Sequence, residues 1–223
     1  MLTEKWLCEL GHDLERGYAG TGPCHDLGHA VRVALLAERI ARAEGIDEEA
    51  AVLASLLHDV GHAAAGKAHA DDHEERSSKA AAWLLRGRVG DSALASIIDA
   101  VEGRRFAKLG LPRQPVGAVL DDADNLDAIG CTGAARAFLW LGEHGRTVDT
   151  AAGTHAKLSA LAHADAAALR RHWSAKLAHL PAAMRTPTGA RLAAVRAAQL
   201  QQFLSCLEEE VADLLQDVCG SQA

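Results

Sequence analysis

The chain has few of the residues that mark disulfide-rich, aromatic-rich or membrane-spanning proteins. Its five cysteines are an odd number, are widely spread and form no C-x-x-C pair, so a disulfide framework, a zinc knuckle and a redox motif are not expected. Only eight residues are aromatic. The longest apolar runs, such as residues 50–57, are far shorter than the roughly 18 residues that cross a bilayer. No transmembrane helix is predicted.

The distribution of charge excludes two further classes. Residues 4–15 carry several charges where a signal peptide would need an uninterrupted apolar stretch, so we expect a cytoplasmic protein. A formal net charge of −7 disfavours binding to duplex nucleic acid, which needs an excess of Lys and Arg on one face. A small anionic substrate is compatible with this charge, because a metal ion can reverse its sign locally.

What the chain does contain is enough for one folded domain. It has 223 residues, of which 49% are hydrophobic and 24% charged, as in ordinary globular proteins. No long Ser/Pro-rich linker divides it. We therefore predict a single domain over residues 1–223, with a core that holds the functional site at about 20–145 and a C-terminal helical extension at about 150–218.

The hydrophobic pattern predicts an all-α fold. Apolar residues recur at spacings of three and four, and no period-two strand pattern is convincing. Prolines fall in the gaps or first turns of the predicted helices, where they are tolerated: Pro112, Pro115, Pro181 and Pro187. The helices are predicted from Thr3 through Gly11 or beyond, and at about 25–44, 47–61, 74–87, 91–104, 115–129, 132–142, 155–179 and 188–216.

Two histidines and an aspartate lie where this pattern would bury them. His29 shares one face of its predicted helix with Val33 and Ile40. The next helix is apolar on most sides and ends in His58 and Asp59. A buried histidine alone is more often a satisfied core residue, but a buried aspartate needs a cation, several hydrogen bonds or a metal. The combination favours a functional site.

Four carboxylates lie close together in a later predicted helix: Asp121, Asp122, Asp124 and Asp127. A solvated acidic face is one interpretation. The helical wheel places Asp122 between apolar residues, and so periodicity favours Asp122 rather than Asp124 as the inward group. Carboxylates this close repel one another unless positive charge lies among them. With the two histidines they would form a nitrogen and oxygen site suited to Mn, Fe, Co, Ni or Zn.

In the contexts HDLGHAVRV, LASLLHDVGH and LDDADNLDAIG, the ordered residues His29, His58, Asp59 and Asp124 resemble the HD-domain superfamily of metal-dependent phosphohydrolases. The segments GRRFAKLGLP, DADNLDAIGCTGAARAF, RRHWSAKL and MRTPTGARLA are similar to the small stand-alone bacterial YedJ-like members. The resemblance covers most of the chain. It implies a single HD-domain helical bundle with additional C-terminal helices.

The resemblance also implies a ligand set. His29, His58, Asp59 and Asp124 would hold a divalent metal ion, which could be Mn, Mg, Co, Ni, Fe or Zn. The ligand position in the family pattern is Asp124, and we follow it against the wheel. The two carboxylates that remain are expected to support the ligands from behind: Asp122 and Asp127.

Two residues depart from the family pattern. Some HD proteins that hold two metals have a further histidine where this chain has Arg104, so we expect one metal ion. HD nucleotidases can have a glutamate four residues after the histidine of the HD pair, where this chain has His62, a candidate proton-transfer group. His69 and His73 lie close enough in the sequence to contribute a ligand or a general base, although a loop or surface histidine is the more common case. No role is predicted for the histidines further downstream: His163, His172 and His179.

Phosphate requires cationic or hydrogen-bonding groups beside the metal. The predicted substrate-binding residues are Lys67, Ser78, Arg104 and Lys176, although each could equally be a solvated surface residue. The predicted catalytic residues are Asp59, His62 and Lys67. Asp59 or a nearby histidine such as His62 would orient or deprotonate the attacking water, and Lys67 or Arg104 would stabilise developing charge.

The function implied by the resemblance is hydrolysis of a nucleotide, or of another small phosphate ester or anhydride, by attack of metal-bound water. Two alternatives stay open: a di-iron HD-type oxygenase and a non-catalytic nucleotide-binding HD module. Two irons per chain would favour the first, and a bound nucleotide that survives incubation with metal would favour the second. We expect a small phosphorylated partner, no duplex nucleic acid and no membrane, and leave the oligomeric state open.

Overall fold

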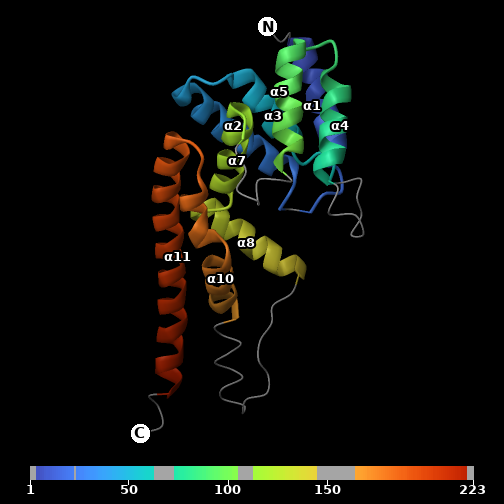
Figure 1. Cartoon of the computed structure of the whole chain (residues 1–223). Coiled ribbons are helices and arrows are strands. Elements are labelled where there is room, and N and C mark those ends of the chain that lie inside the picture. Colours follow the sequence, from blue (N-terminus) through green and yellow to red (C-terminus); the bar gives the residue numbers. More distant parts are fainter. Residues whose placement is uncertain (1–3, 23, 63–72, 105–112, 145–163, 220–223) are drawn as a thin grey trace. The chain divides into compact units, whose positions relative to one another are not determined.

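The computed structural model describes residues 4–22, 24–62, 73–104, 113–144 and 164–219 (Figure 1). Every regular element in these residues is helical and none is a strand, which confirms the predicted all-α class. None of the described helices combines the length and apolarity needed to span a membrane. The chain forms two compact units: unit 1 is Met1–Asp127 with Met184–Arg191, and unit 2 is Ala128–Ala183 with Leu192–Ala223.

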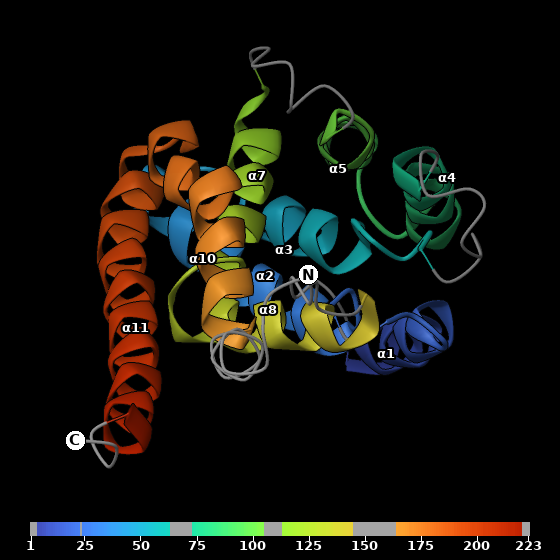
Figure 2. The ribbon, with the colours of Figure 1, turned by 90° about the horizontal axis from the view of Figure 1, so that it is seen from below.

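Unit 1 is built around a trio of mutually packed helices. In it α2 packs against α3 and α7, and α3 also packs against α7 (Figure 2). A second layer is formed by α5, which contacts α3, α4 and α7. The helices of this unit are α1 (Glu4–Tyr18), α2 (Leu27–Glu44), α3 (Glu48–Leu57), α4 (His73–Leu85), α5 (Asp91–Glu102) and α7 (Pro115–Asp127).

Local capping signals set the ends of the two helices that carry the histidines. The Asp26 side chain accepts a hydrogen bond from the His29 amide, 2.8 Å away, and so begins α2. Gly45 ends this helix in the left-handed region, at φ 67°. Asp47 caps α3 in the same way as Asp26 caps α2. The third helix was predicted to end near Gly61, but α3 ends at Leu57 because tight turns replace the helix from residue 58 onward.

Those turns lie directly against α4 through Gly61. A Cβ at this position would lie 2.6 Å from the His73 carbonyl oxygen and 2.7 Å from the Ser77 nitrogen. The Gly61 amide donates to the Ser77 hydroxyl, and its carbonyl accepts from Arg76. Only glycine allows this approach, so its backbone holds the beginning of α4 next to the end of α3.

The inward direction that the wheel predicted for Asp122 has a structural cause. Asp122 is fully buried and accepts hydrogen bonds from the amides of Arg185 and Thr186, at 2.7 and 2.8 Å, and from the Thr186 hydroxyl at 2.7 Å. These donors immediately precede α11 (Pro187–Cys219). Asp122 therefore caps the beginning of a helix that is distant in sequence.

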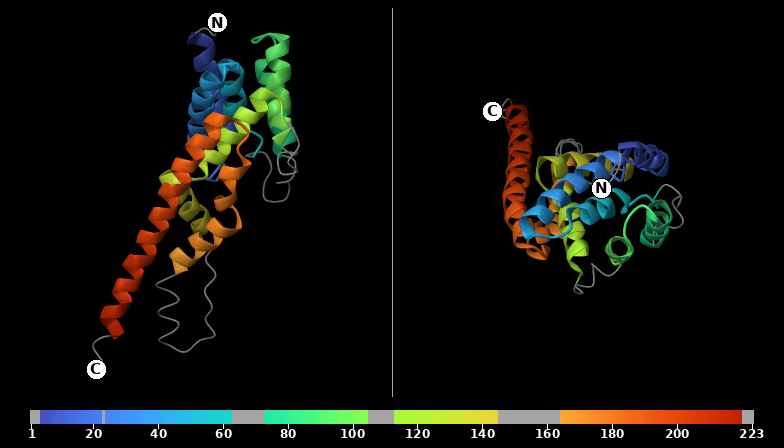
Figure 3. Two further views of the ribbon diagram at one scale, coloured as in Figure 1. Left: turned by 60° about the vertical axis from the view of Figure 1, so that its left-hand side comes forward. Right: turned by 90° about the horizontal axis from the view of Figure 1, so that it is seen from above.

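Unit 2 contains α8 (Gly130–His144), α10 (Ala164–Ala175), η3 (Leu177–Ala183) and the greater part of α11, which is one long helix in Figure 3. Its core joins α8, α10 and α11 through Ala137, Leu169 and Leu204. The structure differs from the prediction of one helix at 155–179. The helix α10 ends at Ala175 and is followed by a 3₁₀ helix that contains Pro181. Proline lacks the N–H that an α-helix would use there. Residues 155–163 lie outside the described residues.

We predict that Asp122→Ala lowers the free energy of unfolding by roughly 2–4 kcal/mol, because it leaves the amides of Arg185 and Thr186 without an acceptor. Denaturant or thermal unfolding, followed by circular dichroism, measures this loss. Asp122→Asn is the matched control: it keeps one acceptor oxygen and should lose less. Equal stability of Asp122→Ala and the unaltered chain would contradict the capping role.

Candidate metal centre

Four side chains meet where α2, the end of α3 and α7 come together. They are the predicted ligands His29, His58, Asp59 and Asp124. Both histidines are fully buried and Asp59 is 1% exposed. The Nε2 atom of His29 lies 3.3 Å from Asp124 Oδ1, and that of His58 lies 3.3 Å from Asp59 Oδ2. Donor atoms of His29, His58 and Asp124 all lie within 4.8 Å of one another, close enough to share one ion.

Both imidazoles are oriented by a hydrogen bond at their other nitrogen. His29 Nδ1 donates to Asp127 Oδ2, 2.8 Å away, and Asp127 in turn forms an ion pair with Arg32. His58 Nδ1 donates to the Ser55 carbonyl oxygen at 2.6 Å. A proton on each Nδ1 directs the Nε2 lone pair of a neutral ring toward the carboxylates. This arrangement of a ligand supported by a carboxylate or a carbonyl is typical of metal-binding histidines.

These donors fit a divalent cation. The Nε2 atom of His58 is buried and makes no hydrogen bond to any described residue. Lone pairs of neutral imidazoles and oxygens of ionised carboxylates are all acceptors, so they repel one another unless a cation lies between them. Two nitrogen and two oxygen donors suit first-row divalent metals better than ions that prefer thiolate or purely oxygen sites.

Arg104, just after α5, bridges the two carboxylates. Its Nη1 donates to Asp59 Oδ1 at 3.1 Å, and its Nη2 donates to Asp124 Oδ2. Burial opposes ionisation of Asp124, but the positive charge of Arg104 outweighs it, so the pKa of this carboxyl lies well below its usual value. Burial also opposes the charge on Arg104, and Asp124 and Asp59 outweigh it, so the pKa of Arg104 lies above its usual value.

A row of three imidazoles borders Asp59 on the more exposed side. His25 Nδ1 lies 2.7 Å from Asp59 Oδ2 and its ring stacks on His62, with the centroids 4.5 Å apart. The rings of His62 and His73 follow at 4.1 Å. Burial lowers the pKa of His62 to about 4, so this ring is neutral at pH 7.

Sequence reasoning assigned no role to His25, although a signal was present. His25 precedes His29 by one helical turn, and the same wheel that placed His29 inward places His25 on the same side. Asp127, by contrast, is where a supporting carboxylate was expected, behind His29. Asp122 was expected to support the ligands too, but its contacts are those of the cap described above.

The other predicted substrate residues are placed as follows. Lys67 lies outside the described residues. Ser78 is 5% exposed and its hydroxyl donates to the Glu75 carbonyl oxygen of its own helix. Lys176 is exposed and follows α10 in unit 2. Substrate binding by these three residues stays a prediction.

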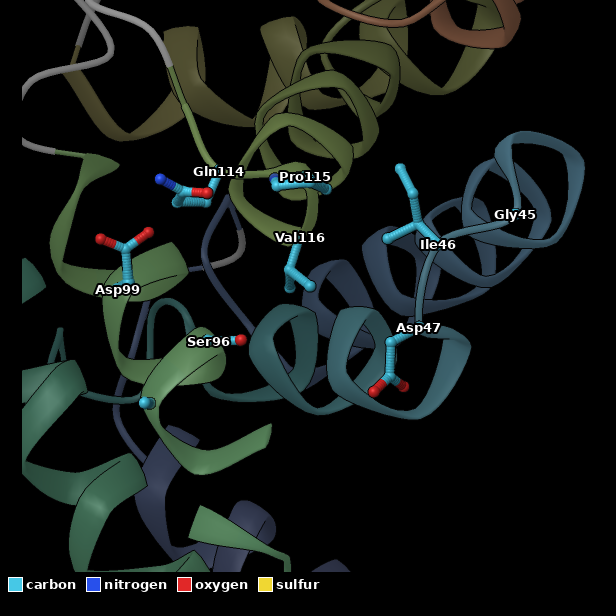
Figure 4. A pocket seen from close by; sticks show the side chains of 9 residues that line it. Gly45, Ile46, Asp47, Ser96, Asp99, Gln114, Pro115 and Val116 are labelled. Atoms are coloured by element: carbon cyan, nitrogen blue, oxygen red, sulfur yellow. The ribbon is translucent and has the colours of Figure 1, made fainter. Parts of the chain in front are cut away.

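A pocket of about 530 Å³ also lies in unit 1, between the α2–α3 connection, α5 and the beginning of α7 (Figure 4). Its walls combine apolar side chains such as Ile46 and Val116 with the carboxylates of Asp47 and Asp99. None of the four predicted ligands lines it. The carboxylate of Asp47 is already used as the cap of α3. This pocket is therefore separate from the metal centre.

Comparison with known proteins finds a family model that is similar to the region of the metal centre. Residues 26–129 match the family model described as the HD domain. This range includes His29, His58, Asp59 and Asp124. The protein YpgQ of Bacillus subtilis is 29% identical over 191 residues, which is 84% of each of the two chains.

Several solved structures are similar to this chain over nearly its whole length. The crystal structure of Bacillus subtilis YpgQ in complex with ADP has a TM-score of 0.65 at 27% identity and covers 92% of this chain and 95% of its own. A Lactobacillus plantarum protein has a TM-score of 0.68 at 27% identity, with coverage of 96% and 100%. An HD-superfamily hydrolase of Bacillus thuringiensis has a TM-score of 0.63 at 25% identity, with coverage of 93% and 95%.

Replacing Asp124 by alanine should remove the metal ion while helical content is kept, because the charged ligand is lost but the apolar contacts of α7 are not. Metal analysis after dialysis, together with circular dichroism, measures both. Asp122→Ala is the matched control: it removes a carboxylate two residues away and should keep the metal. The assignment of Asp124 as a ligand would be contradicted if Asp124→Ala bound a full complement of metal, or if only the control Asp122→Ala lost its metal.

Asp127→Ala should weaken metal binding roughly 10- to 100-fold, because the orientation of His29 is lost while all ligands remain. Titration calorimetry with Mn²⁺ measures the change in affinity. Asp99→Ala, which removes a carboxylate from the separate pocket, should bind Mn²⁺ as the unaltered chain does. Equal affinity of Asp127→Ala and the unaltered chain would show that Asp127 does not support the ligand.

Proposed function

We propose that this chain is a metal-dependent phosphohydrolase of the HD-domain family that acts on a nucleotide or another small phosphate ester or anhydride. The match of residues 26–129 to the HD domain model supports this proposal. One observation carries the proposal: two oriented imidazoles and two ionised carboxylates face one another in the core of unit 1. Similarity to an HD-superfamily hydrolase supports hydrolysis as the reaction class.

His29, His58, Asp59 and Asp124 would hold the metal ion. A divalent ion bound there supplies Lewis acidity, which lowers the pKa of a water ligand and polarises a phosphoryl oxygen. The chain's own residues prepare this chemistry. Asp127 and the Ser55 carbonyl keep the two imidazoles in the tautomer that binds metal, so the donors need no rearrangement.

Charge at the centre favours an anionic substrate. The two ionised carboxylates balance a divalent ion, and Arg104 then leaves the centre one unit positive. This residue is partly exposed, so its guanidinium can also donate to a phosphate oxygen. Lys67 is proposed as a second cationic donor on the grounds of sequence alone. The complex of Bacillus subtilis YpgQ with ADP supports a nucleotide as the ligand class.

His62 and Asp59 are proposed to manage the proton of the attacking water. The neutral His62 ring has its Nε2 atom 3.7 Å from Asp59 Oδ1, and 23% of its side chain is exposed. The neutral nitrogen of His62 is free of a proton at pH 7 and can accept one, and the charge of Asp59 partly offsets the effect of burial on the imidazolium that forms. Asp59 orients the water through hydrogen bonding, and His62 transfers the proton toward solvent.

The proposed reaction predicts hydrolysis that needs metal but not dioxygen. A panel of nucleotides and phosphoesters, incubated anaerobically with Mn²⁺, should give at least one product that carries oxygen-18 from labelled water on a phosphoryl group. A chelator should abolish the activity and added Mn²⁺ should restore it. Asp124→Ala is the inactive control. Strict dependence on dioxygen with two irons per chain would show an oxygenase, and a bound nucleotide that persists with metal would show a binding module.

A further inference from the structure

We propose that Arg104 serves as a built-in cation in place of a second metal ion, and that it keeps closed a second metal position formed by Asp59, His62 and His73. The inference rests on the proposed metal centre and deepens it. It assigns Arg104 a positioning role at the metal centre, in addition to any contact with substrate.

Each of the two carboxylates divides its oxygens between the histidines and Arg104. Asp59 presents Oδ2 to His58 Nε2, at 3.3 Å, and Oδ1 to Arg104 Nη1, at 3.1 Å. Asp124 presents Oδ1 to His29 Nε2, at 3.3 Å, and Oδ2 to Arg104 Nη2. The planar guanidinium therefore spans both carboxylates with its two terminal nitrogens. Each carboxylate is left with one oxygen for the first metal position.

A second group of donors lies beyond Asp59. One donor atom each of Asp59, His62 and His73 lies within 4.8 Å of the others, and this group shares only Asp59 with the four proposed ligands. His62 Nε2 is 3.7 Å from Asp59 Oδ1, the same oxygen that accepts from Arg104. Both imidazoles are partly buried, with 23% and 18% of their side chains exposed. Two nitrogens and a carboxylate oxygen form a donor set for a divalent metal.

Arg104 and an ion at this second position would compete for one oxygen. A metal bound by His62, His73 and Asp59 Oδ1 would place two positive charges on the same carboxylate oxygen at close range, and these charges repel. The guanidinium is already present, covalently attached and bonded to a second carboxylate at Asp124. The guanidinium of Arg104 therefore keeps its place at Asp59 Oδ1, and a second metal ion is excluded from the position next to it.

The role of Arg104 differs from that of a metal in what it offers the substrate. A guanidinium provides fixed hydrogen-bond donors and one positive charge, and it carries no water ligand. The centre therefore gains the charge that helps to bind phosphate without a second site for activating water. A single bound ion would activate the water, and Arg104 would add fixed positive charge beside it.

Removal of Arg104 should open the second position. After equilibration with excess Mn²⁺ and removal of free ion, elemental analysis should find one Mn²⁺ per unaltered chain and two per chain of Arg104→Ala. Electron paramagnetic resonance should show an isolated Mn²⁺ signal in the first case and a spin-coupled pair in the second. Arg104→Gln, which keeps more of the side-chain volume, should also bind two and serves if Arg104→Ala does not fold.

Three matched variants test the assignment. Arg104→Lys keeps a positive charge and should bind one ion. Arg185→Ala removes an arginine that pairs with Asp121, 2.9 Å away, and should also bind one. The double variant Arg104→Ala with His73→Ala should return from two ions to one, because it removes a ligand of the second position only.

Two results would overturn the inference while leaving the proposed function intact: two ions in the unaltered chain, or one ion in folded Arg104→Ala and Arg104→Gln at saturating Mn²⁺. Failure of the unaltered chain to bind any divalent ion would overturn the inference together with the proposed function. Helical content from circular dichroism, recorded for every variant, separates loss of the second position from loss of the fold.

Discussion

The arrangement of helices in unit 1 depends on two ionised carboxylates that lie among them. Asp59 and Asp124 are kept charged at the meeting point of α2, α3 and α7, where water cannot solvate them freely. Their partners come from separate elements: His29 from α2, His58 from the end of α3, and Arg104 from beyond α5. The packing of these helices and the neutralisation of the charges therefore depend on each other. Displacement of one helix would leave a carboxylate without its partner.

The burial of the two histidines and the fold class could be predicted because both depend on local order in the sequence. The apolar stripe around His29 and the apolar helix that ends at His58 and Asp59 are periodic signals, and both histidines are fully buried. Capping residues such as Asp26 and Asp47 are equally local, which explains why the beginnings of α2 and α3 lie within two residues of the predicted ones.

What could not be predicted depends on contacts between residues far apart in the chain. Periodicity correctly predicted that Asp122 is buried. It cannot distinguish a capping carboxylate from a metal ligand, because the amides that Asp122 binds, those of Arg185 and Thr186, are distant in the sequence. The same limit applies to Arg104. It was predicted as a cationic donor to substrate, and its bonds to Asp59 and Asp124 could not be foreseen because they exist only once α5 is packed beside α7.

The close contact at Gly61 has an evolutionary consequence. Because the Gly61 backbone is bonded to Ser77 and Arg76, the position of α4 relative to the end of α3 is set by contacts that lie outside residues 63–72. Insertions, deletions or substitutions within residues 63–72 can therefore accumulate in a lineage without moving His62 or His73. Gly61 thus keeps the rings of His62 and His73 next to each other, although the two histidines belong to different segments of the chain.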